Sequence, residues 1–184
     1  MTLLNTGTMC ITVAVAAGNL TLAGISGNVL PVLRHPKLIL IFLIYFLFQV
    51  EMLIVGKMIA IGSETMLYST RHWIALSFLG FIALMIIADI LKNKNEFSGT
   101  LQAKEILRII FSTSLYILLL GWSFRWLGIH DPQIKNILMQ LLLLFLVIGL
   151  LLGKWHYNRA LKILRWVEAV LIIAGTVILF FVTI

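Results

Sequence analysis

The chain has 184 residues, of which 61% are hydrophobic and 11% are charged, and its mean hydropathy is +1.09. Soluble domains carry about a quarter of their residues as Asp, Glu, Lys and Arg, so this composition excludes an ordinary globular protein in water. The apolar residues stand in long runs, such as residues 38–48, without the alternation typical of a transmembrane barrel. We therefore predict an all-α integral membrane protein, folded as a single transmembrane domain over residues 1–184.

Apolar runs predict six transmembrane helices, at about 4–28, 38–61, 72–92, 105–127, 136–153 and 164–184. The first run lacks the charged start and the cleavage pattern of a secretory signal, so we interpret it as a span. Proline or polar clusters separate later runs, at 34–37, 92–100 and 130–132. Because these connections are short, we expect neighbouring helices to be antiparallel.

The first predicted helix is smaller and more polar than the others. It carries Asn5, Thr8, Thr12 and Asn19 among glycine and alanine residues. Small residues let helices approach closely in a membrane, so we expect this helix to be the most buried one, at the centre of the bundle. Its polar side chains serve either close packing alone or the lining of a polar cavity.

Basic residues are concentrated in the connections after the first, third and fifth spans. By the positive-inside rule these connections are cytoplasmic and both termini face outside, an N-out and C-out topology. We expect these connections to contact anionic lipid head groups or a cytosolic protein. The net charge of +7 comes from basic residues spread over short loops, which form no face for direct nucleic-acid binding. The candidate contact residues are Arg34, Lys37, Lys92, Lys94, Lys154, Arg159, Lys162 and Arg165.

The longest polar loop divides the predicted spans into two groups of three. With an odd number of spans per half, halves that share a fold must be inserted in opposite orientations. This is the inverted-repeat plan of many secondary transporters, whose binding sites lie near the midplane where the repeats meet. We therefore predict two inverted three-helix repeats.

Three acidic residues stand at or near membrane depth, where a charge is costly. Glu51 lies near the middle of the second span, with no charged residue at helical contact spacing. It either carries a proton or cation or is a hydrogen-bonded structural acid. Asp89 stands three residues before Lys92, and Glu168 stands three residues after Arg165. That spacing predicts ion pairs on a helix surface.

No motif for catalysis or metal binding is recognisable. The histidines His35, His72, His130 and His156 fall in four different loops or helix ends, and the lone cysteine, Cys10, excludes an internal disulfide. The sequence has no CxxC, no HExxH and no glycine-rich phosphate loop. We therefore expect no enzyme activity, no catalytic residues, no metal site and no cofactor.

Three short segments point to a known family by their order and by the loop lengths between them. They are His72-Trp-Ile-Ala75, Leu84-Met-Ile-Ile87 and Ser112-Thr-Ser-Leu115. With the six predicted spans and the small first helix, they make the chain similar to the bacterial manganese efflux pump family within the LysE-type transporter superfamily. The resemblance extends over nearly the whole length. It implies the fold of that family and a place in the bacterial cytoplasmic (inner) membrane.

The resemblance also implies an aspartate on the first helix of each half, which helps to form the cation site. A hard divalent cation prefers such carboxylate oxygens. The matching positions here hold Ile11 and Tyr116, which supply no carboxylate. The family's acid on the second span corresponds to Glu51 or Gln49, and the acid on the third span to Asp89.

Two functions from different classes follow. The missing carboxylates favour a non-transporting anchor or sensor subunit, which forms homo-oligomers or recruits a cytosolic partner through its basic inner loops, in a bacterial stress or antiphage defence system. The alternative is an efflux transporter for a divalent, manganese-like cation or a small solute. Its altered site would be centred on Glu51 and completed by Gln49, Thr12, Asn19, Tyr116 and Asp89.

Overall fold

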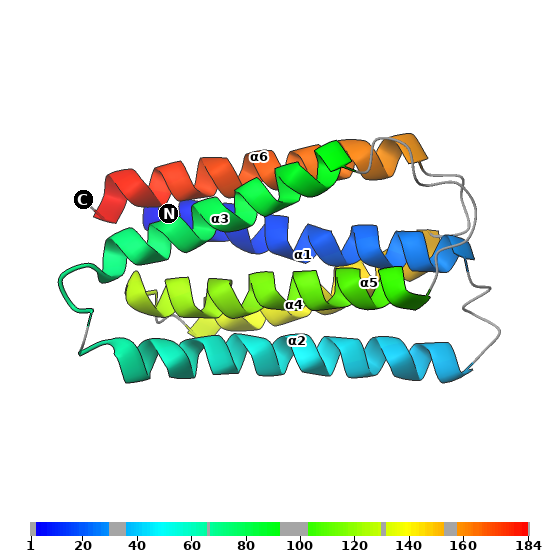
Figure 1. The fold of residues 1–184 in the computed structure, drawn as a ribbon, viewed down its shortest axis with the longest axis horizontal. Helices are drawn as coiled ribbons and strands as arrows, with labels where there is room; N and C mark the ends of the chain where they lie inside the picture. Colours follow the sequence, from blue (N-terminus) through cyan, green and yellow to red (C-terminus); the bar gives the residue numbers. More distant parts are fainter. Residues whose placement is uncertain are drawn as a thin grey trace.

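The computed structural model describes residues 3–29, 36–65, 67–92, 103–129, 132–152 and 158–183. These residues form six α-helices: α1 (Leu3–Val29), α2 (Pro36–Ser63), α3 (Arg71–Lys92), α4 (Ala103–Trp126), α5 (Pro132–Leu152) and α6 (Asn158–Thr183). The helices lie side by side, and successive helices run in opposite directions (Figure 1). The all-helical prediction is confirmed, with each helix at one of the predicted apolar runs.

The helix boundaries differ most from the predicted spans at the starts of α5 and α6. Helix α5 begins at Pro132, four residues before the predicted span, because a proline fits the first helical position, where its missing N–H is not needed. Helix α6 begins at Asn158, six residues before the predicted span, and so includes polar residues that hydropathy alone excludes.

Five of the described helices are long and apolar enough to cross a membrane, namely α1, α2, α3, α5 and α6. Helix α4 is not among them, and its polar residues include the run Ser112-Thr-Ser114. The structure therefore supports a membrane protein with several spanning helices. The sixth span and the N-out, C-out orientation stay predictions.

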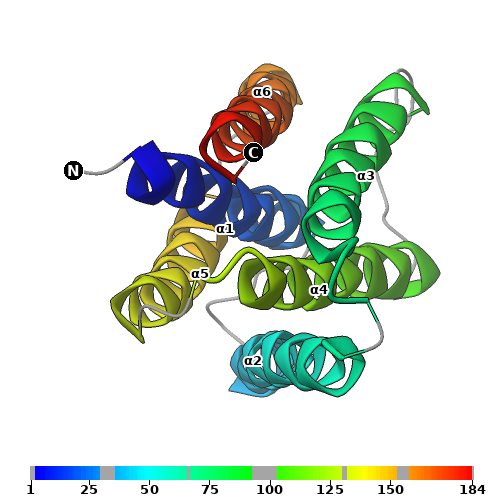
Figure 2. The same ribbon diagram turned by 90° about the vertical axis from the view of Figure 1, so that its left-hand side faces the viewer.

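Two helices occupy the middle of the bundle. Helices α1 and α4 lie at its centre, with α2, α3, α5 and α6 around them (Figure 2). Helix α1 packs on α5 and α6, α4 packs on α2 and α3, and α3 also packs on α6. The two halves of the chain therefore have matching neighbours, with α1 corresponding to α4, α2 to α5 and α3 to α6. Two equivalent three-helix halves would pack in this way.

Helix α1 is the most buried of the five candidate spans. In its segment Leu3–Leu20, 56% of the residues are buried, against 28–33% in the other four. Ile11, Ala14 and Ala16 have no exposed surface. The expectation that the small, polar first helix occupies the centre is confirmed, since small side chains allow α5 and α6 to approach it closely.

Reciprocal glycine contacts fix the crossing of α2 and α4. A Cβ atom added at Gly56 would lie 2.1 Å from the Leu118 carbonyl oxygen, and one added at Gly121 would lie 2.5 Å from the Leu53 carbonyl oxygen. Both distances are far below a van der Waals contact, and the obstructing atoms belong to rigid helical backbone. The two helices can therefore be this close only while both positions are glycine.

We predict that Gly121→Ala separates α2 from α4 and destabilises the protein by about 1–3 kcal/mol, the usual range for overpacking. The matched control is Gly80→Ala on α3, because nothing lies within 4 Å of a Cβ added there. Alanine is also the better helix former, so the control should unfold no earlier than wild type. Thermal unfolding in detergent measures both changes. Equal unfolding temperatures for the two variants would contradict the close contact.

Candidate functional site

A cluster of polar side chains is buried near the middle of the bundle. It comprises Asn19 on α1, Tyr45 and Gln49 on α2 and Thr113 on α4, and we call it the central polar cluster. Asn19 is 1% exposed and Gln49 is 0% exposed. Their amides form a reciprocal pair: Asn19 Nδ2 donates to Gln49 Oε1, and Gln49 Nε2 donates to Asn19 Oδ1, both at 2.7 Å.

Further hydrogen bonds connect this amide pair to two more helices. The Tyr45 hydroxyl donates to Asn19 Oδ1 at 2.9 Å and hydrogen-bonds with Thr113 Oγ1 at 2.7 Å. Gln49 Nε2 also donates to the Tyr45 hydroxyl. Asn19 Nδ2 donates to the main-chain oxygen of Leu142 on α5 at 3.2 Å. Every nitrogen and oxygen of the two amides thus has a partner, as burial away from water requires.

Glu168 on α6 is a buried carboxyl group beside this cluster. Its side chain is 5% exposed, and a Cβ atom added at Gly18 would lie 2.9 Å from Glu168 Oε1. The carboxyl group therefore lies against the α1 backbone, one residue before Asn19, and it interacts electrostatically with the Tyr45 hydroxyl. The prediction of an exposed surface pair between Glu168 and Arg165 is wrong, because the missing side chain at Gly18 leaves room for Glu168 inside the bundle.

The central polar cluster and Glu168 together offer neutral oxygens and one carboxylate. Amide, hydroxyl and carboxylate oxygens are ligands that hard cations accept. One carboxylate compensates a single positive charge, so a dehydrated divalent cation would keep part of its charge uncompensated here. Among the described residues, no three His, Cys, Asp or Glu side chains are close enough together to hold a metal ion.

The structure brings together only some of the site residues expected from the sequence. Gln49 and Asn19 are in direct contact. Thr12 is fully buried on α1, but its hydroxyl donates to the main chain of its own helix at 2.7 Å. Tyr116 is buried on α4, and its hydroxyl accepts a hydrogen bond from Ser112 Oγ at 2.9 Å.

Glu51, the expected centre of the site, is exposed on the outer surface of α2. It is two residues from Gln49, which places the two side chains about 200° apart around the helix. Because Gln49 points into the bundle, Glu51 points away from the central polar cluster. Asp89 belongs to α3, and its side chain is outside the part of the chain that the structure describes.

The structure does not describe the side chains of most basic residues that were expected in the cytoplasmic connections. Arg165 is half-buried on α6. Four of these residues belong to helices, but their side chains are not described: Lys37, Lys92, Arg159 and Lys162. The other three fall outside the described residues: Arg34, Lys94 and Lys154.

The sequence-based site did not include Tyr45, Thr113 or Glu168. A signal for Tyr45 was present, because it stands four residues before Gln49 and so lies on the same face of the helix. Two hydrogen-bonding side chains on one face of an otherwise apolar span mark a face that packs against protein rather than lipid.

We predict strong coupling between Asn19 and Gln49. Each single change to leucine leaves the other amide buried without its partner and should destabilise the protein by about 0.6–2 kcal/mol. The double variant should be less destabilised than the sum of the two single variants, because it removes both polar groups. Unfolding in denaturing detergent, measured for all four proteins, gives the coupling energy. Strictly additive effects would contradict the reciprocal pair.

Comparison with known proteins places the chain in one family. A model of the family described as "Putative manganese efflux pump" matches residues 33–184. This segment contains α2 to α6, and with them every residue of the central polar cluster except Asn19. No curated protein and no solved structure matches the chain. Because the match covers well over half of its length, the chain belongs to the manganese efflux pump family.

Proposed function

We propose that the protein is a membrane efflux transporter for a manganese-like cation, with its site at the central polar cluster and Glu168. Family membership supports a transporter. The observation that carries the location is the buried Glu168 carboxyl group beside neutral oxygens near the middle of the bundle. Acidic residues at membrane depth are rare, and by default they belong to ion or proton pathways.

The origin of the ligands in both halves of the chain supports this location. Asn19, Tyr45 and Gln49 come from the first three helices, while Thr113 and Glu168 come from the last three. In transporters built from inverted repeats, the binding site lies near the midplane between the repeats. Helices α1 to α3 have the same pattern of packing neighbours as α4 to α6, and this similarity supports such repeats here.

The hydrogen bonds of the cluster determine how a cation would be bound. Asn19 and Gln49 bind each other, so a cation that approaches Glu168 must displace this pair to gain their oxygens. Movement of α2 relative to α1 would open the pair. With one carboxylate, the site would bind a divalent cation weakly and with part of its water shell retained.

The matched pair of substitutions Glu168→Gln and Glu51→Gln tests this site. Both remove one carboxylate with little change in shape, but only Glu168 is buried at the cluster. In a bacterial strain without its own manganese exporter, wild type should lower the manganese content of the cells. Glu168→Gln should lose at least about 90% of this effect, because the compensating charge is gone, whereas Glu51→Gln should retain it.

Metal content measured by elemental mass spectrometry, at equal amounts of protein in the membrane, decides the outcome. Loss of export in Glu51→Gln with full export in Glu168→Gln would contradict the location and favour a site centred on Glu51. Export unchanged in both variants would rule out either carboxylate as the essential ligand.

A second candidate function is a non-transporting anchor or sensor subunit of the bacterial inner membrane. The observation that favours it is the burial of Ile11 and Tyr116, which are 0% and 8% exposed, at the positions that correspond to the family's aspartates. In this proposal the protein forms homo-oligomers, or its basic inner loops recruit a cytosolic partner in a stress or defence system. Transport activity would then be absent.

Purification from native expression in mild detergent distinguishes the second function. A subunit should retain a stoichiometric cytosolic partner, identified by mass spectrometry, and should lose it when Arg34, Lys37, Lys154 and Arg159 are changed to glutamine. A partner is expected because basic loops attract acidic surfaces. Purification of the protein alone, together with manganese export that depends on Glu168, would contradict the subunit function.

A further inference from the structure

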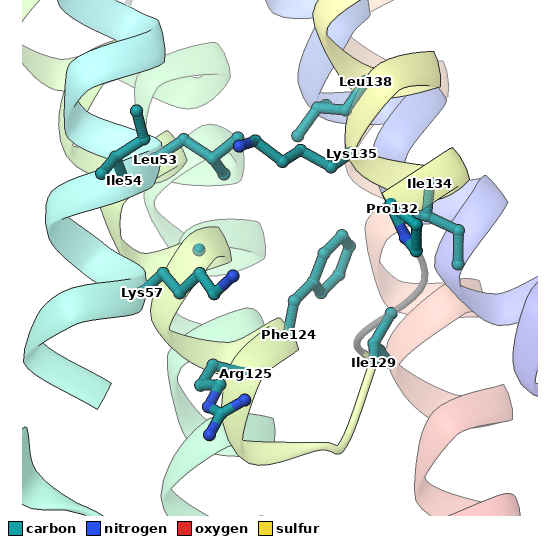
Figure 3. A pocket seen from close by; sticks show the side chains of 11 residues that line it. Leu53, Ile54, Lys57, Phe124, Arg125, Ile129, Pro132, Ile134, Lys135 and Leu138 are labelled. Atoms are coloured by element: carbon teal, nitrogen blue, oxygen red, sulfur yellow. The ribbon is translucent and has the colours of Figure 1, made fainter. Parts of the chain in front are cut away.

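A pocket of about 260 Å³ lies between α2, α4 and α5, at the end of the bundle where α2 and α4 finish. Three basic side chains from three helices line it: Lys57 on α2, Arg125 on α4 and Lys135 on α5. Figure 3 shows Lys57 and Lys135 reaching into the pocket from opposite sides. Apolar side chains form most of the remaining lining, namely Leu53, Ile54, Phe124, Ile129, Ile134 and Leu138.

The positive charge of this pocket exceeds its negative charge. Glu64 contacts both Arg71 and Arg125 at 3.2 Å, so one carboxylate is shared by two guanidinium groups. Lys57 and Lys135 make no ion pair within the described part of the chain. Within α5 itself, the first turn contains Lys135 and no acidic residue. An anion would therefore be attracted to the pocket.

The apolar lining specifies which kind of anion fits. Part of the apolar lining lies further from the end of the bundle than the basic residue on the same helix. On α2, Leu53 and Ile54 are further from the end of the helix than Lys57, and on α5, Leu138 is further from the start of the helix than Lys135. Arg125 lies in the last turn of α4. Ile54 is 42% exposed, so the pocket continues onto the outer surface of the bundle. A ligand with a charged group at one end and a hydrocarbon chain at the other would satisfy both parts of the lining.

We propose that this pocket binds one anionic phospholipid. The phosphate would lie between the ammonium groups of Lys57 and Lys135, and an acyl chain would extend along Ile54 and Leu138. A zwitterionic lipid would bind less well, because its own ammonium group approaches the same cations. Helices α2 and α5 make few direct contacts, so a lipid held by a lysine from each would join them. This inference does not depend on the proposed transport function.

Native mass spectrometry of the delipidated full chain in mild detergent tests the proposal. Phosphatidylglycerol and phosphatidylcholine with identical acyl chains are the two probes. Wild type should bind phosphatidylglycerol at least about tenfold more tightly than phosphatidylcholine. The double variant Lys57→Gln/Lys135→Gln should bind phosphatidylglycerol about 30-fold more weakly than wild type does. The charge-retaining double variant Lys57→Arg/Lys135→Arg should bind like wild type, which separates lost charge from misfolding.

Two controls locate the effect. Arg71→Gln, at the start of α3 and outside the pocket lining, should leave the affinity unchanged, because Glu64 keeps its ion pair with Arg125. Asp131→Asn removes the acid that precedes α5 in the sequence. This variant should bind phosphatidylglycerol at least as tightly as wild type, because it removes no positive charge. Equal binding of the two lipids, or unchanged binding by the double glutamine variant, would overturn the proposal. Competition by water-soluble glycerophosphate at the same concentration as the lipid would also overturn it, by showing a site for free anions.

Discussion

The absence of water in the membrane interior is the constraint on which this structure depends. Every polar group placed there must find a partner within the protein. Asn19 and Gln49 meet this requirement by binding each other, and in doing so they connect α1, which packs on α5 and α6, with α2, which packs on α4. The hydrogen bonds with Tyr45, Thr113 and the Leu142 carbonyl extend the same connection to α4 and α5. Specific polar contacts thus align helices that apolar packing alone would leave free to slide.

Close backbone approach complements these polar contacts. Lipid tails are as apolar as leucine, so burying apolar side chains does little to drive helices together in a bilayer. Gly56 and Gly121 instead bring α2 and α4 into backbone contact, and Gly175 does the same for α6 against Gly7 on α1. Helices held this tightly keep the Glu168 carboxyl group in a fixed position relative to the central polar cluster.

Features set by composition and periodicity were predictable from the sequence. The apolar runs located the helices, and the small residues of α1 predicted its burial, because both signals belong to a single helix. Glu168 was misinterpreted because its spacing from Arg165 is also the spacing of a surface pair. The decisive feature, the space opposite Gly18, exists only after α1 and α6 have packed. Similarly, the middle position of Glu51 could be inferred from the sequence, but its outward orientation depends on the face of α2 that packs on α4.

The contact between Gly18 and Glu168 also constrains how the protein can evolve. A Cβ atom at position 18 would lie 2.9 Å from Glu168 Oε1, so alanine or serine there requires the carboxyl group to shift. The obstructing atom is the end of a flexible side chain, so the shift costs far less than the one required at Gly56 or Gly121, where the obstructing atom is backbone. A change at position 18 is therefore expected to adjust the place of a carboxyl group that stands 150 residues away in the chain, without removing it.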